Sequence, residues 1–520
     1  MAGGLIQLVS YGIQDVYLTF EPQITFFKMV YRRYTNFALE AIPQFFDSRA
    51  NFGESVTCTL SRCGDLVYHT YLYVILPTVP KFYNQNTNTF DDAVLFAWCK
   101  KIGYVIIKNI TLEIGGQVID RQYGEWLHIW DEMTRVSEEN GLDIMIGNVP
   151  ALYEFSLGKP TYELYIPLRF WFCRNNGLAL PIIALQYNEV KVAVEFRKAR
   201  ECYIITPSHQ YNIIEDICSF KQNDIITQTI NGTTSSAVFA TNDPIGQTIK
   251  YLKINSTSFV SATILKSSFR DSNGVINNTD YSNAISNSDS IQNTPYQITN
   301  GTTYCTPVPN IPETTVNYYN STQFAFVQAF LLVDYVYLDN DERERFVKGN
   351  HEYLIEQVQI ATDQTVSNSG VSLSLALNHP IKSLYWVCQL DYFAVQPIND
   401  WFNYTNSYKN GVSLIRSASI LLNGQPRFST RNGDYFNTVQ PYQHHANSPA
   451  IGINCYSLSI SPEHTQPSGT CNMSRIDNIN LVLSLDTSIG PNNTATIRAY
   501  GLGYNVLRII NGLGGVVFIN

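Results

Sequence analysis

The sequence predicts an all-β protein made of two tandem copies of one β architecture. Tyrosine (34 residues) and phenylalanine (27) are abundant, and charged residues make up only 15% of the 520-residue chain, which favours strands and loops. Residues 167–196 read as strand, polar bend and strand, and 189–196 alternate with the period of a strand that is wet on one face. A weaker echo of this unit at 454–485 indicates a duplication.

The first copy begins with two predicted strands, at 55–61 and 65–76, followed by a polar loop at 81–92. Residues 104–119 hold two further strands, joined by a Gly-Gly turn. Residues 125–136 predict a helix, because large apolar side chains recur at spacings of three and four. These side chains are Trp126, Ile129, Trp130 and Met133, and Gly141 suits the end of the helix.

The chain changes character between residues 222 and 322, which are rich in Asn, Ser, Thr and Gly. This composition is typical of a disordered linker or of an elaborate surface loop. Short apolar runs at 251–254 and 259–265 indicate partial order, so we expect a long ordered loop or tower with a mobile tip.

The second copy follows a short connection. Residues 324–338 return to strand and close the first copy, and 339–346 read as a short capped helix with an acidic start. New strands are predicted at 371–377 and 381–390, and 494–510 close the second copy.

Two local parallels support the duplication. Residues 417–427 match 110–120 with a Gly-Gln turn in each, and 433–436 match 124–127. The division falls near residue 347. Each copy has about eight strands and one helix-bearing loop, which suits a sandwich or a jelly roll, and periodicity does not distinguish the two.

Residues 1–35 lie outside the first predicted sheet. They mix apolar and basic side chains without a clear period, and the candidates for contact with a partner are Tyr17, Phe20, Phe26, Phe27, Lys28, Arg32 and Arg33. Either the segment lies on its own domain, or it is an arm that docks on a partner or near a membrane surface.

Composition excludes several classes of function. A net charge of −9 leaves no basic footprint for nucleic acid, so we expect no direct contact with a genome. The first residues lack the charged start of a secretory signal, and no apolar run of about 18 residues is present to span a bilayer. The ten cysteines form no paired C-x-x-C motif, so we expect free, mostly buried thiols made in a reducing compartment.

The histidines do not form a convincing metal site. His351-Glu352 lacks the second histidine of a zinc-protease helix. His444, His445 and His464 are more typical of hydrogen-bonded surface groups than of ligands.

Other candidate chemistry is also better explained as structure. The acidic residues of 339–346 are interleaved with arginines, which indicates a salt-bridged helix and not a glycosidase pair. Trp126 and Trp130 are more typical of core or interface anchors than of a sugar-stacking platform. We therefore predict no catalytic residues, no metal and no cofactor.

Several stretches, in order along nearly the whole chain, resemble the major capsid protein of nucleocytoplasmic large DNA viruses. They are GGQVIDRQYGEWLHIW, RFWFCRNNGLALPIIALQYNEV, DYVYLDNDERERF, NHPIKSLYW and QPSGTCNMSRIDN. The opening LVSYGIQDVYLTFEPQITFFKMVYRRYTNF is similar to the N-terminal arm of that family. Residues 222–322 match nothing in it, which suggests a lineage-specific surface insertion.

The resemblance implies two tandem eight-stranded jelly rolls with short helices in loops. We expect an N-terminal arm at 1–35, a first jelly roll at 36–347 that carries the insertion, and a second at 348–520. The resemblance further implies a homotrimer that forms pseudo-hexagonal capsomers, which tile an icosahedral shell over an internal membrane. Minor capsid proteins lie beneath, where the family's arm also sits. The protein would be made in the host cytoplasm and would not be an enzyme.

Two further expectations concern sugars. Some viruses of this type glycosylate their capsids, and the insertion contains five possible acceptors in Asn-x-Ser/Thr triplets: Asn231, Asn255, Asn277, Asn300 and Asn320. The alternative to a capsid protein is a glycan-binding or glycan-cleaving β-sandwich protein, which the aromatic residues and the long loop would suit.

Overall fold

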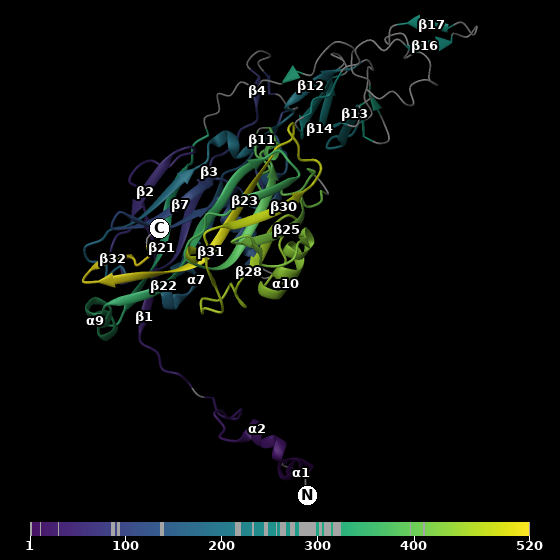
Figure 1. Cartoon of the computed structure of the whole chain (residues 1–520). Helices are drawn as coiled ribbons and strands as arrows, with labels where there is room; N and C mark the ends of the chain where they lie inside the picture. The colour runs from purple at the N-terminus through teal and green to yellow at the C-terminus, as the bar shows by residue number, and fades with distance from the viewer. Residues whose placement is uncertain are drawn as a thin grey trace.

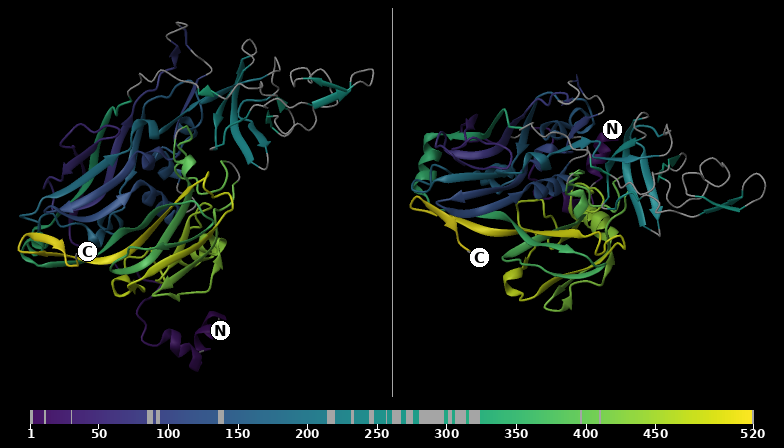
Figure 2. Two further views of the ribbon diagram at one scale, coloured as in Figure 1. Left: turned by 45° about the horizontal axis from the view of Figure 1, so that its top comes forward. Right: turned by 90° about the horizontal axis from the view of Figure 1, so that it is seen from above.

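The computed structural model describes the chain apart from residues 1–2, 11, 30, 85–88, 91–93, 136–139, 214–219, 231–232, 244–247, 256, 261–266, 271–275, 280–297, 301–303, 306–313, 316–323, 396, 409–410 and 519–520. Figure 1 shows two β-sandwiches side by side, a smaller sheet at one end, and an N-terminal arm that leaves the opposite end. Figure 2 shows the same parts from two further directions.

The first sandwich consists of two four-stranded antiparallel sheets, ordered β1-β21-β3-β9 and β2-β10-β7-β8. Their strands are β1 (Phe37–Gln44), β21 (Gln328–Leu338), β3 (Leu66–Leu76), β9 (Tyr162–Pro167), β2 (Ser55–Thr59), β10 (Val190–Phe196), β7 (Ile107–Ile114) and β8 (Gln117–Tyr123). Every second residue of β10 is buried, as the alternation in its sequence predicts. Apolar side chains from both sheets meet in one core, which gives a jelly roll.

The second sandwich repeats this strand order. Its sheets follow the paths β22-β31-β24-β28 and β23-β30-β25-β26, with three short strands added. The strands are β22 (His351–Val366), β31 (Ala495–Ile510), β24 (Pro380–Leu390), β28 (Asn454–Ser457), β23 (Gly370–Ser374), β30 (Ile479–Leu485), β25 (Ile415–Leu422), β26 (Gln425–Pro426), β27 (Arg431–Asn432), β29 (Cys471–Asn472) and β32 (Leu513–Val516). A second core fills the space between these sheets, so the protein is a double jelly roll.

Two glycines mark the same place in both copies. A Cβ on Gly124 would lie 2.4 Å from the carbonyl oxygen of Ile107, and a Cβ on Gly433 would lie 2.1 Å from that of Ile415. Ile107 and Ile415 are the first residues of β7 and β25. Only glycine permits this approach of backbone to backbone, which confirms the match between 124–127 and 433–436.

The helix predicted at 125–136 is α4 (Gly124–Thr134). It ends where Arg135 adopts an extended conformation, and Gly141 lies within the next helix, α5 (Asn140–Met145), so Gly141 does not cap α4 as we expected. The corresponding segment of the second sandwich is a π-helical turn, η6 (Tyr435–Val439), continued by α10 (Gln440–His444).

One predicted strand is wrong and another begins too early. The prediction of a strand over 167–173 is wrong, because β9 ends at Pro167 and α7 (Trp171–Arg174) is one helical turn. Similarly, α3 (Ile102–Val105) precedes β7, where we expected a strand from residue 104. Phe170, Trp171 and Phe172 are all buried, whereas a strand would send alternate side chains to opposite faces. A short apolar run does not distinguish a strand from a buried helical turn.

The insertion, together with the preceding strand β12, forms a separate sheet, ordered β19-β18-β13-β14-β15-β12-β20. Its strands are β12 (His209–Asn212), β13 (Ile225–Ile230), β14 (Thr233–Asp243), β15 (Thr248–Lys253), β18 (Ile298–Thr299), β19 (Tyr304–Cys305) and β20 (Thr314–Thr315), and β16 (Ser267–Arg270) pairs with β17 (Ile276–Thr279). The sheet has a small core that includes Tyr211, Phe239 and Tyr251. This confirms the expected order, and the predicted mobile tip lies outside the described residues.

The remaining elements are short. Helical segments are α1 (Gly3–Val9), η1 (Ile13–Asp15), α2 (Val16–Thr19), α6 (Pro150–Tyr153), η2 (Asn176–Leu178), η3 (Ala199–Glu201), α9 (Asn340–Lys348), η5 (Asp391–Phe393) and η7 (Met473–Arg475). Short strands are β4 (Tyr83–Asn84), β5 (Thr89–Phe90), β6 (Leu95–Trp98) and β11 (Tyr203–Thr206). In α9, Asp339 caps the first turn and Lys348 pairs with Glu344 at 2.7 Å, as expected for a salt-bridged helix.

Candidate functional surfaces

Helix α4 joins the two sandwiches. It belongs to the first, but its apolar face packs on β24 and β31 of the second. The ring centroids of Trp126 and Tyr385 lie 5.3 Å apart, and those of Trp126 and Tyr500 lie 5.8 Å apart. Trp126 and Trp130 are 2% and 4% exposed, so the prediction that they are anchors is confirmed.

A buried ion pair lies at the start of α4. The carboxylate of Glu125 accepts hydrogen bonds from Nε (2.6 Å) and Nη2 (2.8 Å) of Arg498 in β31. The hydroxyls of Tyr500 (2.6 Å) and Tyr404 (3.1 Å) donate to the same carboxylate. Burial alone would raise the pKa of Glu125, but Arg498 and the two hydroxyls hold it below its usual value.

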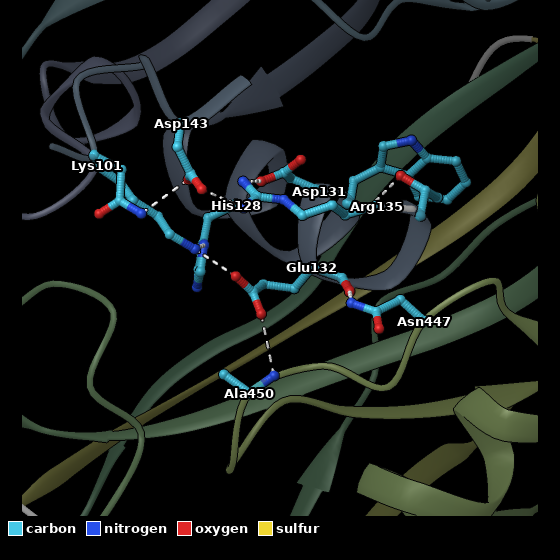
Figure 3. Close-up of polar contacts among 11 residues, drawn as sticks. Lys101, His128, Asp131, Glu132, Arg135, Asp143, Asn447 and Ala450 are labelled. Carbon is cyan, nitrogen blue, oxygen red and sulfur yellow. Dashed lines mark hydrogen bonds and ion pairs between the residues drawn. The ribbon is translucent and has the colours of Figure 1, made fainter. Parts of the chain in front are cut away.

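The other end of α4 is also attached to the second sandwich (Figure 3). Glu132 pairs with Lys101, and its second carboxylate oxygen accepts the backbone N–H of Ala450 at 3.2 Å. The carbonyl oxygen of Glu132 accepts Nδ2 of Asn447 at 3.0 Å. Arg135 bridges Asp131 of the same helix and Asp143 of α5, so this end of α4 is also tied to the first sandwich.

Two further polar contacts cross between the sandwiches. Asp120 of β8 accepts the backbone N–H of Val358 in β22 at 3.0 Å, and burial raises the pKa of Asp120 to about 6. Glu356 is buried between Arg174 of the first sandwich and Lys382 of the second. Burial lowers the pKa of Lys382 to about 8, against the opposing effect of Glu356.

Sequence reasoning missed these polar connections. The available signal was Arg498, one of two arginines in the otherwise apolar run 494–510 with Arg508, and the sequence does not say which of the two faces the interior. A charged residue in such a strand requires a buried partner, but the sequence does not say that the partner is Glu125, 373 positions away.

The structure places the predicted arm residues away from the sandwiches (Figure 1). Phe20, Phe26 and Phe27 are 70%, 90% and 98% exposed, and Lys28, Arg32 and Arg33 are exposed as well. Tyr17 lies in α2. The arm therefore presents apolar rings and three cations together.

The strand that follows the arm is open along one edge. β1 is the outer strand of its sheet, and Phe37 and Leu39 on it are more than half exposed. They help to line an apolar groove of about 390 Å³, together with Val336, Leu338 and Phe346. An exposed apolar edge strand is a surface that proteins normally cover.

A second apolar patch lies around α10. Tyr442, Ile451 and Ile460 are 84%, 53% and 74% exposed, and Nδ1 of His444 lies 2.9 Å from the carbonyl oxygen of Ile460. Ile451 and Ile460 lie outside the helices and strands, and Tyr442 lies in a helix of only five residues, so no periodic sequence pattern pointed to this patch.

The predicted glycan acceptors fall into two groups. Nδ2 of Asn255 donates to the carbonyl oxygen of Thr234 (2.9 Å), Nδ2 of Asn300 donates to Asp224 (3.0 Å), and Asn277 lies in β17. Asn231 and Asn320 lie outside the described residues.

The described residues contain no group of three or more His, Cys, Asp or Glu side chains placed to hold a metal ion. His445 lies 2.9 Å from Glu463. Burial raises the pKa of the Cys58, Cys173 and Cys388 thiols to about 12, which leaves them protonated at neutral pH. No described helix is long and apolar enough to cross a bilayer.

Comparison with known families gives two matches. A family described as major capsid protein N-terminus matches residues 25–241, and one described as large eukaryotic DNA virus major capsid protein matches residues 342–515. The chain is 48% identical to probable capsid protein 4 of Acanthamoeba polyphaga mimivirus, over all of this chain and 99% of that protein. It is 34% identical to the major capsid protein of Phaeocystis pouchetii virus, over the whole of both chains.

Solved structures give the same result. A quasi-atomic model of the PBCV-1 virus capsid matches 95% of this chain and all of its own with a TM-score of 0.60 and 26% identity. The faustovirus major capsid protein matches 96% of this chain and 94% of its own with a TM-score of 0.64, and at 11% identity this shows the fold alone.

Proposed function

This chain belongs to the family of large eukaryotic DNA virus major capsid proteins, and from that membership we propose that it forms homotrimers with a pseudo-hexagonal outline. Its role is structural, as a component of the viral capsid, and the glycan-binding or glycan-cleaving alternative is not favoured. The capsomers tile an icosahedral shell by repeated lateral contacts.

The observation that carries this proposal is the rigid pairing of two matching sandwiches through α4. Each sandwich presents the same strand order, and the Glu125–Arg498 pair and the Trp126 contact fix the angle between them. Three such chains around an axis give six similar corners. Each lateral contact in the shell is then small, because many act together.

Exposed apolar surfaces support self-association. The β1 edge with Phe37 and Leu39 and the patch of Tyr442 and Ile460 both expose side chains that an isolated protein would normally bury. We assign these surfaces to contacts between copies of the chain, in the trimer and between capsomers.

The arm has a different role in this proposal. Its exposed rings at Phe26 and Phe27 and its cations at Lys28, Arg32 and Arg33 suit an apolar and acidic partner surface. We assign that surface to minor capsid proteins beneath the shell, close to an internal membrane. Residues 1–35 are then the arm, and 36–347 and 348–520 are the two jelly rolls.

The opposite end of the molecule carries the inserted sheet, which we place on the outer face of the capsid. The acceptors in the insertion would then carry sugars outward. Synthesis and assembly in the host cytoplasm are supported by the eight cysteines whose side chains the structure describes, all of which are free thiols.

The experiment is size-exclusion chromatography with light scattering on the purified full chain, followed by electron microscopy. The expected particle has three times the chain mass of 58.8 kDa and a six-cornered outline. A stable monomer or a two-fold dimer under these conditions would contradict the proposal.

A further inference from the structure

Helix α4 has a counterpart in the second sandwich, the 433–444 segment, which consists of η6 and α10 with the two residues before them. This segment begins at Gly433 as α4 begins at Gly124, with the same close approach to a strand carbonyl. Three residues further on, Leu127 enters the core of the first sandwich and Phe436 enters the core of the second. The two helical segments therefore run in the same register.

The outward positions of the two segments differ in exposure. In α4 they are 4% exposed or less, because they pack on β24 and β31, and they are Trp126, Ile129, Trp130 and Met133. The same spacing after Gly433 gives Tyr435, Thr438, Val439 and Tyr442. Of these, Val439 and Tyr442 are 39% and 84% exposed. The 433–444 segment thus presents at its surface the positions with which α4 joins the two sandwiches.

The first sandwich carries a surface equivalent to the one that α4 covers. In its sheet, β3 and β21 hold the places that β24 and β31 hold in the second. Alternate residues of these strands, such as Leu72 and Leu331, point into the core. The opposite face carries large apolar side chains that are half-buried or exposed. They are Tyr71, Phe330 and Leu332, with Phe45 at the edge.

This outer face is an aromatic cluster that the described residues leave partly exposed. The ring centroid of Phe330 lies 4.5 Å from that of Tyr73 and 5.5 Å from that of Phe45, and Phe45 is 62% exposed. In contrast, β24 is buried on both faces, because α4 covers its outer one. Clustered aromatic rings are typical of the core of an interface between proteins.

The 433–444 segment and this outer face lie far apart within one chain. Figure 1 shows α10 and β1 on opposite sides of the pair of sandwiches. A second copy supplies what each surface lacks, because every copy carries both. The contact of α4 with β24 and β31 shows that a helix at this point of a sandwich fits the outer face of the neighbouring sheet.

We propose that the 433–444 segment of one copy packs on the outer face of β3 and β21 of the next copy, with Val439 and Tyr442 against Phe330 and Leu332. This inference rests on the homotrimer proposed above and names one of its interfaces. It joins the second sandwich of one copy to the first sandwich of the next, and a head-to-tail contact of this kind can close into a ring. Because Val439 stands where α4 has Trp130, less apolar area is buried between chains than within one.

The direct test is photo-crosslinking of the full chain with Tyr442→p-benzoylphenylalanine, followed by mass spectrometry of the cross-linked peptides. We expect a species of twice the chain mass of 58.8 kDa, in which position 442 is joined to residues 66–76 or 328–338. Tyr187→p-benzoylphenylalanine, at a 75% exposed tyrosine outside both surfaces, is the control and should give no link to those strands. Links from position 442 that stay within one chain, or that fall on other segments of the second copy, overturn the proposal.

A double variant tests the energetic role of the contact. Val439→Asp with Tyr442→Asp changes two exposed side chains and should raise the dissociation constant of the trimer by about tenfold or more, measured by light scattering on dilution. Tyr187→Asp is the matched control and should dissociate as the parent does. A parent chain that is itself monomeric contradicts the proposed function. A trimeric parent whose double variant folds and dissociates no more readily overturns this inference alone, and the cross-links decide the matter if the variant does not fold.

Discussion

Arg498 donates two hydrogen bonds, of 2.6 and 2.8 Å, to the carboxylate of Glu125, although the two residues are 373 positions apart in the chain. Glu125 lies in the first turn of a helix of the first sandwich, and Arg498 lies in the last long strand of the second. Glu125 is buried and Arg498 is largely buried, so the integrity of the pair reports directly on the junction between the jelly rolls.

Replacing Glu125 by Gln should strongly destabilise the junction. The substitution leaves the largely buried guanidinium of Arg498 without a counter-charge, which costs up to about 3–5 kcal/mol in the free energy of unfolding. Urea unfolding followed by tryptophan fluorescence measures the change. Glu344→Gln, in the exposed Glu344–Lys348 pair, is the control and should shift the curve little. Equal shifts for both variants would show that the buried pair does not hold the junction.

Asp120 predicts a specific pH dependence. Its pKa is raised to about 6 by burial, so the folded protein binds this proton more tightly than the unfolded chain does. The contribution of this carboxyl to stability is therefore fully present below the unfolded pKa near 4 and is lost as the pH rises through about 6. Asp120→Asn should raise stability at pH 7.5 by about 1–3 kcal/mol and leave it nearly unchanged at pH 4. Chemical denaturation at the two pH values tests this, and a loss of stability at pH 7.5 would contradict it.

Truncating Trp126 should uncouple the two sandwiches. The ring packs on Tyr385 and Tyr500 of the second sandwich, and removing a buried aromatic side chain costs about 3–5 kcal/mol. In scanning calorimetry we expect Trp126→Ala to split or broaden the unfolding transition, whereas Trp126→Phe should retain one transition at a moderately lower temperature. A single sharp transition in the alanine variant would mean that other contacts carry the coupling.

Deleting residues 1–35 should leave a folded trimer that assembles shells poorly. The arm residues are exposed and contribute little to either core, whereas in our proposal they contact minor capsid proteins. Light scattering measures the trimer, and electron microscopy of virus particles measures the shell. Replacing Phe26 and Phe27 by Ser is the smaller version of this change. Failure of the truncated chain to fold or trimerise would assign the arm to the core.

Glycosylation of the insertion has a direct readout. Sugars on acceptors such as Asn255 and Asn300 would raise the mass of the protein from virions above the 58.8 kDa of the bare chain by multiples of a sugar residue. Intact-mass spectrometry measures this, and a mass equal to that of the bare chain would show that the insertion is not glycosylated.

The repeat could be recognised in the sequence because the backbone requires glycine at equivalent positions of the two copies. Gly124 and Gly433 each touch a strand carbonyl that no side chain could approach, so both positions retain glycine at the same point in each copy. Strands such as β10 could be predicted because one face is buried and the other faces solvent, which leaves an alternation of apolar and polar residues in the sequence.

Sequence reasoning failed where tertiary contacts decide the local structure. The run around Trp171 forms a helical turn because its consecutive side chains are all buried, and periodicity carries no information about that. The partner of Arg498 was hidden because it lies 373 positions away, and the exposed patch at Tyr442 was hidden because its residues follow no helical or strand period. The arm residues are exposed, but their role in docking on a partner stays a prediction.

Strand β24 is buried on both faces, one in the core of its own sandwich and the other against helix α4. On the ribosome, α4 emerges some 250 residues before β24 does. During that interval the strands that Trp126 and Trp130 pack against, β24 and β31, have not yet been synthesised. We therefore expect the apolar face of α4 to need shielding from other chains until β24 and β31 have been translated.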